Sequence, residues 1–123
     1  MAEGIIKTVF VVDDSATNLS MAEVALENNY RVLTFISAEK MFQVLTKVIP
    51  NLILLDIEMP EMNGFDAMKQ LKANDLYSKI PVFFLTAAHD PVNEARGIEL
   101  GACGYITKPF YAAELLDKIN AYV

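Results

Sequence analysis

Residues 9–18 read VFVVDDSATN, an apolar run that leads directly into two adjacent carboxylates, Asp13 and Asp14. The run is strand-sized and rich in β-branched side chains, so it predicts a strand that is buried on both faces. Two neighbouring negative charges at the end of such a strand are unfavourable unless another group compensates them. No basic residue lies close by in the sequence, so the compensating group must come from elsewhere in the fold.

Similar apolar runs recur along the chain and alternate with longer stretches of helical period. The five runs are KTVFVV (7–12), YRVLTFI (30–36), NLILLD (51–56), PVFFLT (81–86) and GYIT (104–107). Strands with continuous apolar sequence are typical of a parallel sheet that right-handed crossover helices cover on both faces. We therefore expect an α/β fold with a single doubly wound, five-stranded parallel sheet and five helices.

Apolar residues recur at helical spacing between these runs, and local signals mark the helix ends. The inward-facing residues expected in the first, second and last helices are Leu19, Ala22 and Leu26; Met41 or Phe42, Leu45 and Ile49; and Leu115, Ile119 and Tyr122. The boundary signals are Ser37 before a helix, Asp90-Pro91 as cap and first-turn proline, Gly101 at a helix end, and Asn63-Gly64 in a turn.

The composition describes a single acidic domain. The chain has 123 residues, of which 54% are hydrophobic, enough for one core but too few to expect two domains. A net charge of −6 with ten scattered Lys and Arg residues argues against nucleic acid as a partner of this domain. One cysteine, no signal-peptide pattern and no apolar run of the ~20 residues that a membrane span needs favour the cytoplasm.

Polar side chains follow the carboxyl ends of four predicted strands: Asp13 and Asp14 the first, Asp56 the third, Thr86 the fourth and Lys108 the fifth. In a sheet of order 2-1-3-4-5, ligands bind at this edge, where the strand order reverses between the first and third strands. The three aspartates then converge, and each pair of charges at ~4 Å repels by roughly 4 kcal/mol at an effective dielectric constant near 20.

Such an acidic cluster needs a cation, and its chemistry indicates which one. Carboxylate oxygens without His or Cys at ligand spacing suit Mg²⁺, which keeps several waters that a phosphate can replace. Lys108 adds a positive charge and Thr86 adds a hydroxyl. This combination favours phosphoryl transfer, which depends mainly on positioning and charge neutralisation. An aspartate can itself be the nucleophile and carry an acyl phosphate.

Four stretches resemble the motifs of response regulator receiver domains of two-component signalling, including the chemotaxis receivers. They are VVDDSATN (11–18), LILLDIEMPEMNGFD (52–66), PVFFLTA (81–87) and GACGYITKPF (101–110), in the family's order over essentially the whole chain. Paired aspartates alone are a weak signal, but the combination is specific. The resemblance implies that residues 1–123 form one receiver domain of flavodoxin-like fold, a signalling module more than a turnover enzyme.

The resemblance also implies the chemistry of the acidic edge. Asp56 would accept a phosphoryl group from a sensor histidine kinase or a histidine phosphotransfer protein. Mg²⁺, with Mn²⁺ as an alternative, would be held by Asp13, Asp14, Asp56 and the backbone carbonyl of Glu58. Lys108 and Thr86 would stabilise the phosphoryl group.

The implied switch lies next to this edge. Thr86 would turn toward the phosphoryl group and Tyr105 would move inward in response. The output surface would be the face of the fourth helix, fifth strand and fifth helix, with an unknown downstream target and a phosphorylation-dependent dimer left open. Pro60, Gly64 and Pro109 would shape the loops around the site, with Pro109 in a cis bond.

Several positions depart from the family pattern or carry no family role. Tyr111 stands where a helix-capping Ser, Thr or Asp is common, so the last helix lacks its cap or starts elsewhere. Glu58 and Ala88 flank the site and are expected to set the acyl-phosphate lifetime by controlling water access. His89 is expected to be a solvated loop residue, and Cys103 a small buried hydrophobic residue without a redox task.

Three alternative functions compete with that of a receiver domain. A docking module that is never phosphorylated stays open. An aspartate-nucleophile phosphatase of the haloacid dehalogenase type is disfavoured, because its motif needs a second Asp where the chain has Glu58. A flavodoxin-like cofactor binder would need a Ser, Thr and Gly phosphate loop where Asp13 and Asp14 stand. Whether the chain is a stand-alone regulator or part of a larger regulator or hybrid kinase also stays open.

Overall fold

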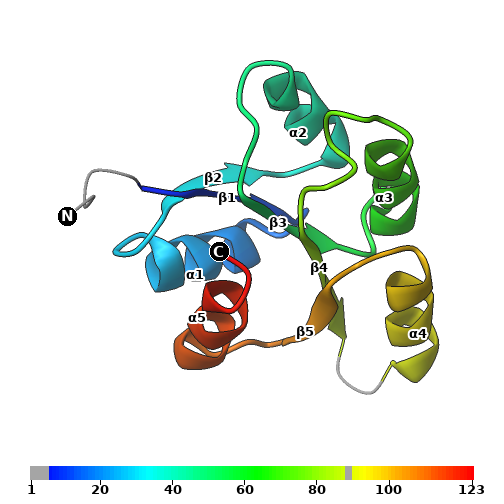
Figure 1. Cartoon of the computed structure of the whole chain (residues 1–123). Coiled ribbons are helices and arrows are strands. Elements are labelled where there is room, and N and C mark those ends of the chain that lie inside the picture. Colours follow the sequence, from blue (N-terminus) through cyan, green and yellow to red (C-terminus); the bar gives the residue numbers. More distant parts are fainter. Residues whose placement is uncertain (1–5, 88–89) are drawn as a thin grey trace.

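Five strands alternate with five helices along the chain (Figure 1). The structure, a computed structural model, describes residues 6–87 and 90–123. The strands are β1 (Thr8–Val12), β2 (Arg31–Phe35), β3 (Leu52–Asp56), β4 (Val82–Ala87) and β5 (Gly104–Lys108). The helices are α1 (Ala16–Leu26), α2 (Ala38–Leu45), α3 (Gly64–Lys72), α4 (Pro91–Glu99) and α5 (Ala112–Asn120).

The strands form one parallel sheet in the order β2-β1-β3-β4-β5, as predicted. β1 and β3 are neighbours, with Val12 opposite Leu55, although α1, β2 and α2 separate them in the sequence. The strand order therefore reverses between β1 and β3, the place where such sheets bind ligands. Asp13 and Asp56, the next residues along the two strands, emerge side by side at the carboxyl edge.

The sheet separates two layers of helices. α1 and α5 cover one face, α2 and α3 cover the other, and α4 lies beside β4 and β5 (Figure 1). Strand side chains alternate between the layers: Phe10 and Val12 join the core under α2 and α3, while Val9 and Val11 join the core under α1 and α5. Both faces are buried, which explains why the strand sequences are continuous apolar runs.

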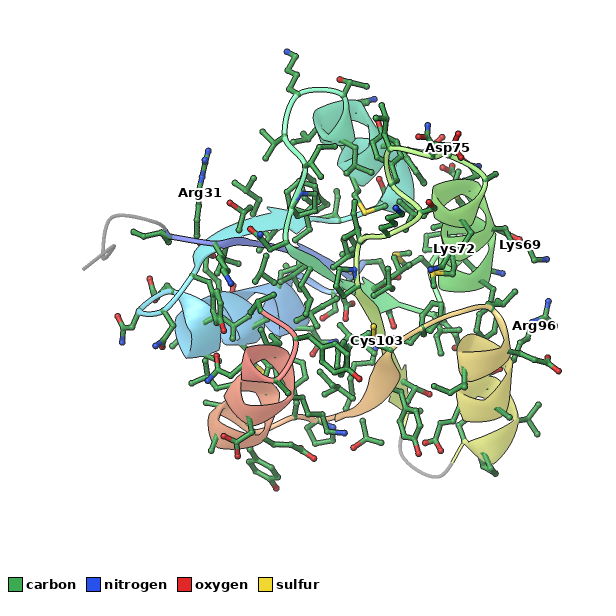
Figure 2. The ribbon with its side chains drawn as sticks, in the orientation of Figure 1. Arg31, Lys69, Lys72, Asp75, Arg96 and Cys103 are labelled. Atoms are coloured by element: carbon green, nitrogen blue, oxygen red, sulfur yellow. The ribbon has the colours of Figure 1, made fainter. Side chains whose placement is uncertain are left out.

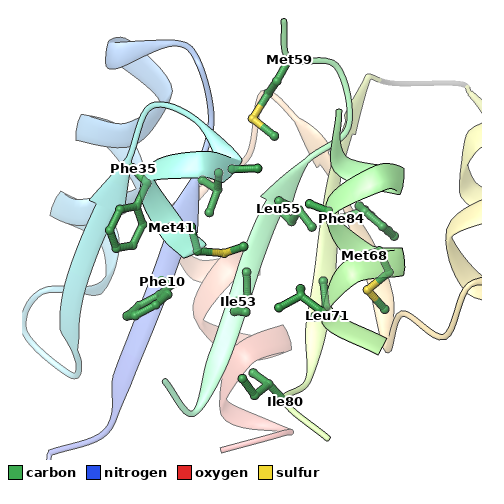
Figure 3. Close-up of a cluster of buried hydrophobic side chains, with 14 of the residues drawn as sticks. Phe10, Phe35, Met41, Ile53, Leu55, Met59, Met68, Leu71, Ile80 and Phe84 are labelled. Carbon is green, nitrogen blue, oxygen red and sulfur yellow. The ribbon is translucent and has the colours of Figure 1, made fainter. Parts of the chain in front are cut away.

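Aromatic pairs tie the α2–α3 core together (Figure 3). The rings of Phe10 and Phe35 meet edge to face with centroids 4.9 Å apart, and those of Phe65 and Phe84 do so at 5.3 Å. These four rings come from β1, β2, α3 and β4. One pair therefore joins β1 to β2, and the other joins α3 to β4.

α4 is much less embedded than its neighbours. Of residues 91–99, all described by the structure, Gly97 alone is buried. A Cβ on Gly97 would lie 2.7 Å from the Phe84 ring, closer than real contacts allow. The backbone of α4 at Gly97 therefore packs directly against the ring of Phe84. This backbone contact, rather than a buried side chain, attaches the helix to β4.

Most predicted helix ends are confirmed. The side chains of Ser37 and Asp90 accept hydrogen bonds from the backbone N–H groups of Lys40 and Asn93, so both residues cap their helices. Gly101, directly after α4 and Leu100, has the positive φ of 105° that favours glycine. Tyr111 occupies the cap position of α5 without a side-chain hydrogen bond, as its residue type predicts.

Three boundary details differ from the prediction. Asn63 caps α3 and Gly64 begins that helix, whereas the sequence placed both in a turn. α2 ends at Leu45 and leaves Ile49 51% exposed, because Ile49 precedes a proline, which disfavours helical backbone. α5 ends before Tyr122, which is 49% exposed and instead packs its ring edge to face on Phe83.

The basic side chains labelled in Figure 2 are spread over several elements: Arg31 on β2, Lys69 and Lys72 on α3, and Arg96 on α4. This spread agrees with the scattering of basic residues in the sequence. Within the described residues, no helix has the length and apolar character needed to cross a bilayer.

Gly64 is required by a close approach between α3 and β3, which gives a stability prediction. A Cβ on Gly64 would lie 2.2 Å from the carbonyl oxygen of Asp56, a backbone atom that cannot move without distorting the strand. We expect Gly64→Ala to lower the free energy of unfolding by roughly 2–3 kcal/mol, as overpacking does.

Urea unfolding followed by circular dichroism measures this change, with Gly104→Ala as the matched control. The nearest atom to a Cβ on Gly104 is 3.4 Å away, on the ring of Phe83, which is an ordinary van der Waals distance. Equal losses of stability in the two variants would contradict the close-approach argument.

Candidate functional site

Three aspartates meet at the carboxyl edge of the sheet. Asp13, Asp14 and Asp56 each offer a carboxylate oxygen, and these oxygens lie within 4.8 Å of one another. Asp13 and Asp56 are buried, while Asp14 is exposed. The convergence predicted from strand order is therefore confirmed. A group of hard oxygen donors with one solvent-facing member has the chemistry of a site that could hold a metal ion.

The start of α1 orients the Asp13 carboxylate. Its Oδ1 accepts a 2.9 Å hydrogen bond from the backbone N–H of Ser15, and its Oδ2 accepts a 3.1 Å bond from the Asn18 side-chain amide. Ser15 also caps α1 by accepting from the backbone N–H of Asn18. Each carboxylate oxygen has further lone pairs, so these bonds fix the group without using up its capacity to bind a cation.

Lys108 supplies the positive charge of the cluster from β5. Its Nζ donates a 2.8 Å hydrogen bond to Oδ1 of Asp56 and lies 3.6 Å from Oδ2 of Asp13. The bond from Lys108 to Pro109 is cis, as expected, and the next residue, Phe110, is buried. Lys108 thus bridges the two buried carboxylates.

The electrostatic imbalance shows in the pKa values. Burial is the largest effect on Asp56, and together with the charges of Asp13 and Asp14 it raises the pKa of this carboxyl to about 6, against the lowering effect of Lys108. Burial lowers the pKa of Lys108, but the bond to Asp56 and the charges of Asp56 and Asp13 outweigh it, so that pKa is raised overall. One lysine does not neutralise the cluster.

A small pocket opens above Asp56. It is lined by residues from β3, β4, β5 and the beginning of α4: Asp56, Ile57, Glu58, Leu85, Thr86, Ala87, Asp90, Asn93 and Lys108. Thr86 is buried, and its hydroxyl donates only a long 3.4 Å bond to the carbonyl of Ala87. Its hydroxyl therefore has little to hold it in this orientation.

Two further expected residues shape the floor and rim of the site. Gly64 donates its backbone N–H to the carbonyl of Ile57 at 2.8 Å, which holds α3 against the end of β3. Pro60 is exposed in the intervening loop, where it lines a second groove with Glu58 and Asn93. The loop that follows Asp56 thus separates these two openings.

Other expected site residues lie elsewhere. Tyr105 does not line the pocket over Asp56 but a surface groove beside α5. Cys103, expected to be buried, is only partly so. Ala88 and His89 lie outside the described residues.

Sequence reasoning missed three contributors to the site. Asn18 binds Asp13 from within the first turn of α1, while Asp90 and Asn93 line the pocket. The serine at position 15 carried a signal for Asn18, because a capping serine accepts from the backbone N–H three residues on and so places that residue in the first turn of the helix. Asp90 was recognised only as a helix cap.

The raised pKa of Asp56 gives a prediction on pH and stability. The folded state holds the Asp56 proton more tightly than the unfolded state, whose pKa is near 3.8. Below pH ~4 the Asp56 carboxyl is protonated in both states and does not lower the free energy of unfolding. Between pH ~4 and pH ~6 its ionisation lowers that free energy progressively, and the loss is complete above pH ~6. In metal-free buffer, Asp56→Asn should exceed the wild type in free energy of unfolding by about 3 kcal/mol at pH 7, and by little at pH 4.

Urea unfolding at a series of pH values in the presence of a chelator measures this difference. The asparagine keeps an oxygen that can accept from Lys108, so the variant removes the charge and retains the contact. A stability difference that does not change with pH would contradict the burial argument.

Comparison with known proteins agrees with this geometry. The family model described as the response regulator receiver domain matches residues 9–120. The phosphate regulon transcriptional regulatory protein PhoB of Pseudomonas aeruginosa is 38% identical over 94% of the chain and 51% of its own length. A Vibrio cholerae protein named "Probable cyclic di-GMP phosphodiesterase" is 35% identical over 94% of the chain but only 26% of its own length. The chain thus spans about half or less of these relatives.

Solved structures share the whole fold. The chemotaxis response regulator CheY4 of Vibrio cholerae gives a TM-score of 0.89 at 28% identity, covering 97% of this chain and all of that one. The signal receiver domain of a signal transduction histidine kinase from Syntrophus aciditrophicus gives 0.85 at 30% identity, over 94% of this chain and 89% of that one. The match over residues 9–120, the strand order and the acidic edge agree, and the chain belongs to the response regulator receiver domain family.

Proposed function

We propose that the chain is the Mg²⁺-dependent phosphoacceptor of a two-component system and that Asp56 takes the phosphoryl group from a phosphohistidine. The donor is a sensor histidine kinase or a histidine phosphotransfer protein. The observation that carries the proposal is the position of Asp56, a buried carboxylate at the base of a pocket, between an acidic cluster and a lysine. A buried carboxylate that is only partly compensated destabilises the fold, so its presence favours a functional role.

The chain's own residues can perform the transfer. A carboxylate oxygen of Asp56 attacks phosphorus, the bond from phosphorus to the donor imidazole nitrogen breaks, and the imidazole leaves with the bonding electron pair. The Lys108 ammonium already contacts Asp56 and can stabilise the negative charge that develops on the phosphoryl oxygens. The Thr86 hydroxyl, weakly held and on the pocket wall, can turn to donate to one of those oxygens.

Mg²⁺ is the cation that this donor set fits best, with Mn²⁺ as an alternative. Asp13, Asp14, Asp56 and the backbone carbonyl of Glu58 would hold it. When bound, it would neutralise the cluster and the incoming phosphoryl oxygens. Because Asp13 is fixed by Ser15 while Asp14 is exposed, the site combines a rigid ligand with an open side for exchange of water.

The readout of phosphorylation would be a change in the surface of α4, β5 and α5. Thr86 lines the pocket, and Tyr105 lies on β5 between the two helices, so these residues would carry the change outward. α4 is a suitable moving part because Gly97 is the only one of its residues that is buried. The downstream target, a phosphorylation-dependent dimer and the cytoplasmic location stay predictions.

The central test is whether Asp56 becomes phosphorylated. Incubation with acetyl phosphate and Mg²⁺ should give a phosphoryl adduct in the intact mass of the wild type, and none without Mg²⁺ or in Asp56→Asn. Asp75→Asn, which removes a carboxylate beyond the far end of α3, is the matched control and should behave as the wild type (Figure 2). No adduct under any condition, with Mg²⁺ binding also absent by titration, would leave a docking module in place of a phosphoacceptor.

The lifetime of the adduct tests the role of Glu58. Its side chain is exposed and lines the pocket, where a carboxylate can accept a proton from an attacking water. We expect Glu58→Ala to slow dephosphorylation by about three- to tenfold, well below the full effect of a general base because the group is exposed. Ala88, the other residue proposed to control water access, lies outside the described residues.

Decay of the intact-mass adduct after removal of the donor measures this rate. Asp66→Ala, an exposed carboxylate in the first turn of α3 that does not line the pocket, serves as the control. The hypothesis fails if the Glu58 and Asp66 variants decay at the wild-type rate.

A further inference from the structure

The pocket above Asp56 shares a boundary with the groove beside it. The pocket has a volume of about 60 Å³, which is room for a few water molecules, and the groove is lined by the loop after β3 and by Phe65. Three residues line both openings: Ile57, Glu58 and Asn93. Ile57 is buried, whereas Glu58 is exposed and Asn93 is half-buried. Water that enters from the groove therefore reaches the phosphoacceptor past Glu58 and Asn93.

Asp90 holds the Asn93 side chain in one orientation. Oδ1 of Asp90 accepts a 3.2 Å hydrogen bond from the backbone N–H of Asn93, the bond that caps α4. Oδ2 of Asp90 accepts a 2.8 Å bond from the side-chain amide of Asn93. A carboxylate can only accept, so the branch of the amide that faces Asp90 must be the nitrogen. The amide oxygen of Asn93 therefore lies on the other branch, away from Asp90.

The contacts of the next turn fix which face of α4 is turned toward the groove. The guanidinium of Arg96 lies 5.0 Å from the centroid of the Phe65 ring, within the range of a cation–π interaction. Gly97 packs against Phe84, whose ring meets that of Phe65 edge to face. Asn93 is three and four residues before Arg96 and Gly97, so it lies on the same face of the helix. The side of α4 that contacts the aromatic pair is thus the side that carries the amide.

An amide at this boundary has the groups needed to bind a water and a phosphoryl group together. Its oxygen accepts hydrogen bonds, and its nitrogen has a second N–H besides the one donated to Asp90. The oxygen can accept from a water while the N–H donates to a phosphoryl oxygen. Amide side chains orient the attacking water in this way at other sites of phosphoryl transfer.

We propose that Asn93 is a catalytic residue of dephosphorylation that orients the water attacking the phosphoryl group on Asp56, and that Asp90 is a positioning residue acting through Asn93. The inference rests on the proposed function, because it concerns removal of the group placed on Asp56. The water oxygen attacks phosphorus, the bond from phosphorus to the Asp56 oxygen breaks, and the carboxylate leaves with the bonding electron pair. The water proton passes to Glu58 and then to solvent, and inorganic phosphate is released.

Decay of the Asp56 adduct in Mg²⁺ after removal of acetyl phosphate, followed by intact mass, tests the role of Asn93. Asn93→Ala removes the amide but keeps the backbone N–H that donates to Asp90, so α4 keeps its cap. Decay should slow by about three- to tenfold, the rate equivalent of one ordinary hydrogen bond. The adduct should form at the wild-type rate, because no water attacks in that step. Val92→Ala, which shortens an exposed neighbour, is the control and should decay as the wild type.

Asp90→Asn tests the positioning role without a change of size. The variant keeps an oxygen that can cap α4, but it presents an N–H where Oδ2 of Asp90 accepted from Asn93. The Asn93 amide must then turn its oxygen toward residue 90, so the water loses its acceptor. Decay should slow as in Asn93→Ala, while circular dichroism should show unchanged helix content.

A double variant tests whether Asn93 and Glu58 act on the same water. If they do, the slowing in Glu58→Ala/Asn93→Ala should be smaller than the product of the two single effects. Full multiplication of the two effects would contradict a shared water.

The remaining outcomes separate this inference from the proposed function. Wild-type decay in Asn93→Ala, with normal formation of the adduct, would overturn the inference alone. Equal slowing of formation and decay would also overturn it, because the whole site would then have changed. Slow decay in Asn93→Ala but wild-type decay in Asp90→Asn would overturn the positioning role of Asp90. A wild type that forms no adduct on Asp56 would overturn the proposed function and this inference with it.

Discussion

Repulsion among Asp13, Asp14 and Asp56 is the constraint on which the rest of the structure depends. The parallel pairing of β1 and β3 fixes two of these residues side by side, so they cannot separate without breaking the backbone hydrogen bonds of the sheet. Burial strengthens the effect, because water that would screen the charges is excluded from Asp13 and Asp56. A chain that keeps such a cluster needs a compensating positive charge, and the fold brings a lysine side chain to it from another strand.

The strand order explains how the compensating charge arrives. β5 is two strands away from β3, with β4 between them, so a side chain from β5 must reach across the end of β4. Lys108 is long enough to do so and contacts Asp56, while Thr86, the next-to-last residue of the intervening strand, is small. A bulky residue in place of Thr86 would obstruct that path. The short hydroxyl side chain thus serves the geometry of the lysine as well as the chemistry proposed for the pocket.

The fold class could be predicted from the sequence because buried strands alternate with amphipathic helices. The strand order, and with it the centre of the site, was supplied in part by the resemblance to receiver domains. Asp56 could be placed beside Asp13 once β1 and β3 were neighbours. The missed contributors come from helix starts: Asn18, Asp90 and Asn93 reach the site only through the exact path of a turn, which apolar periodicity does not encode. The same limit explains the overextended helices, where apolar residues continue at helical spacing after the backbone has left the helix.

Gly97 has a consequence for how such a chain diversifies. Because Gly97 is the one buried residue of α4, the exposed positions of the helix, including Val92 and Ile98, carry little of the stability of the fold. Substitutions there are therefore tolerated more freely than on α1 or α3, which insert several side chains into the core. A domain built in this way can acquire a new partner by changing the outside of α4 while the acidic edge stays the same. Because the helix is attached through a glycine, the sequence of its exposed side can vary in evolution without loss of the fold.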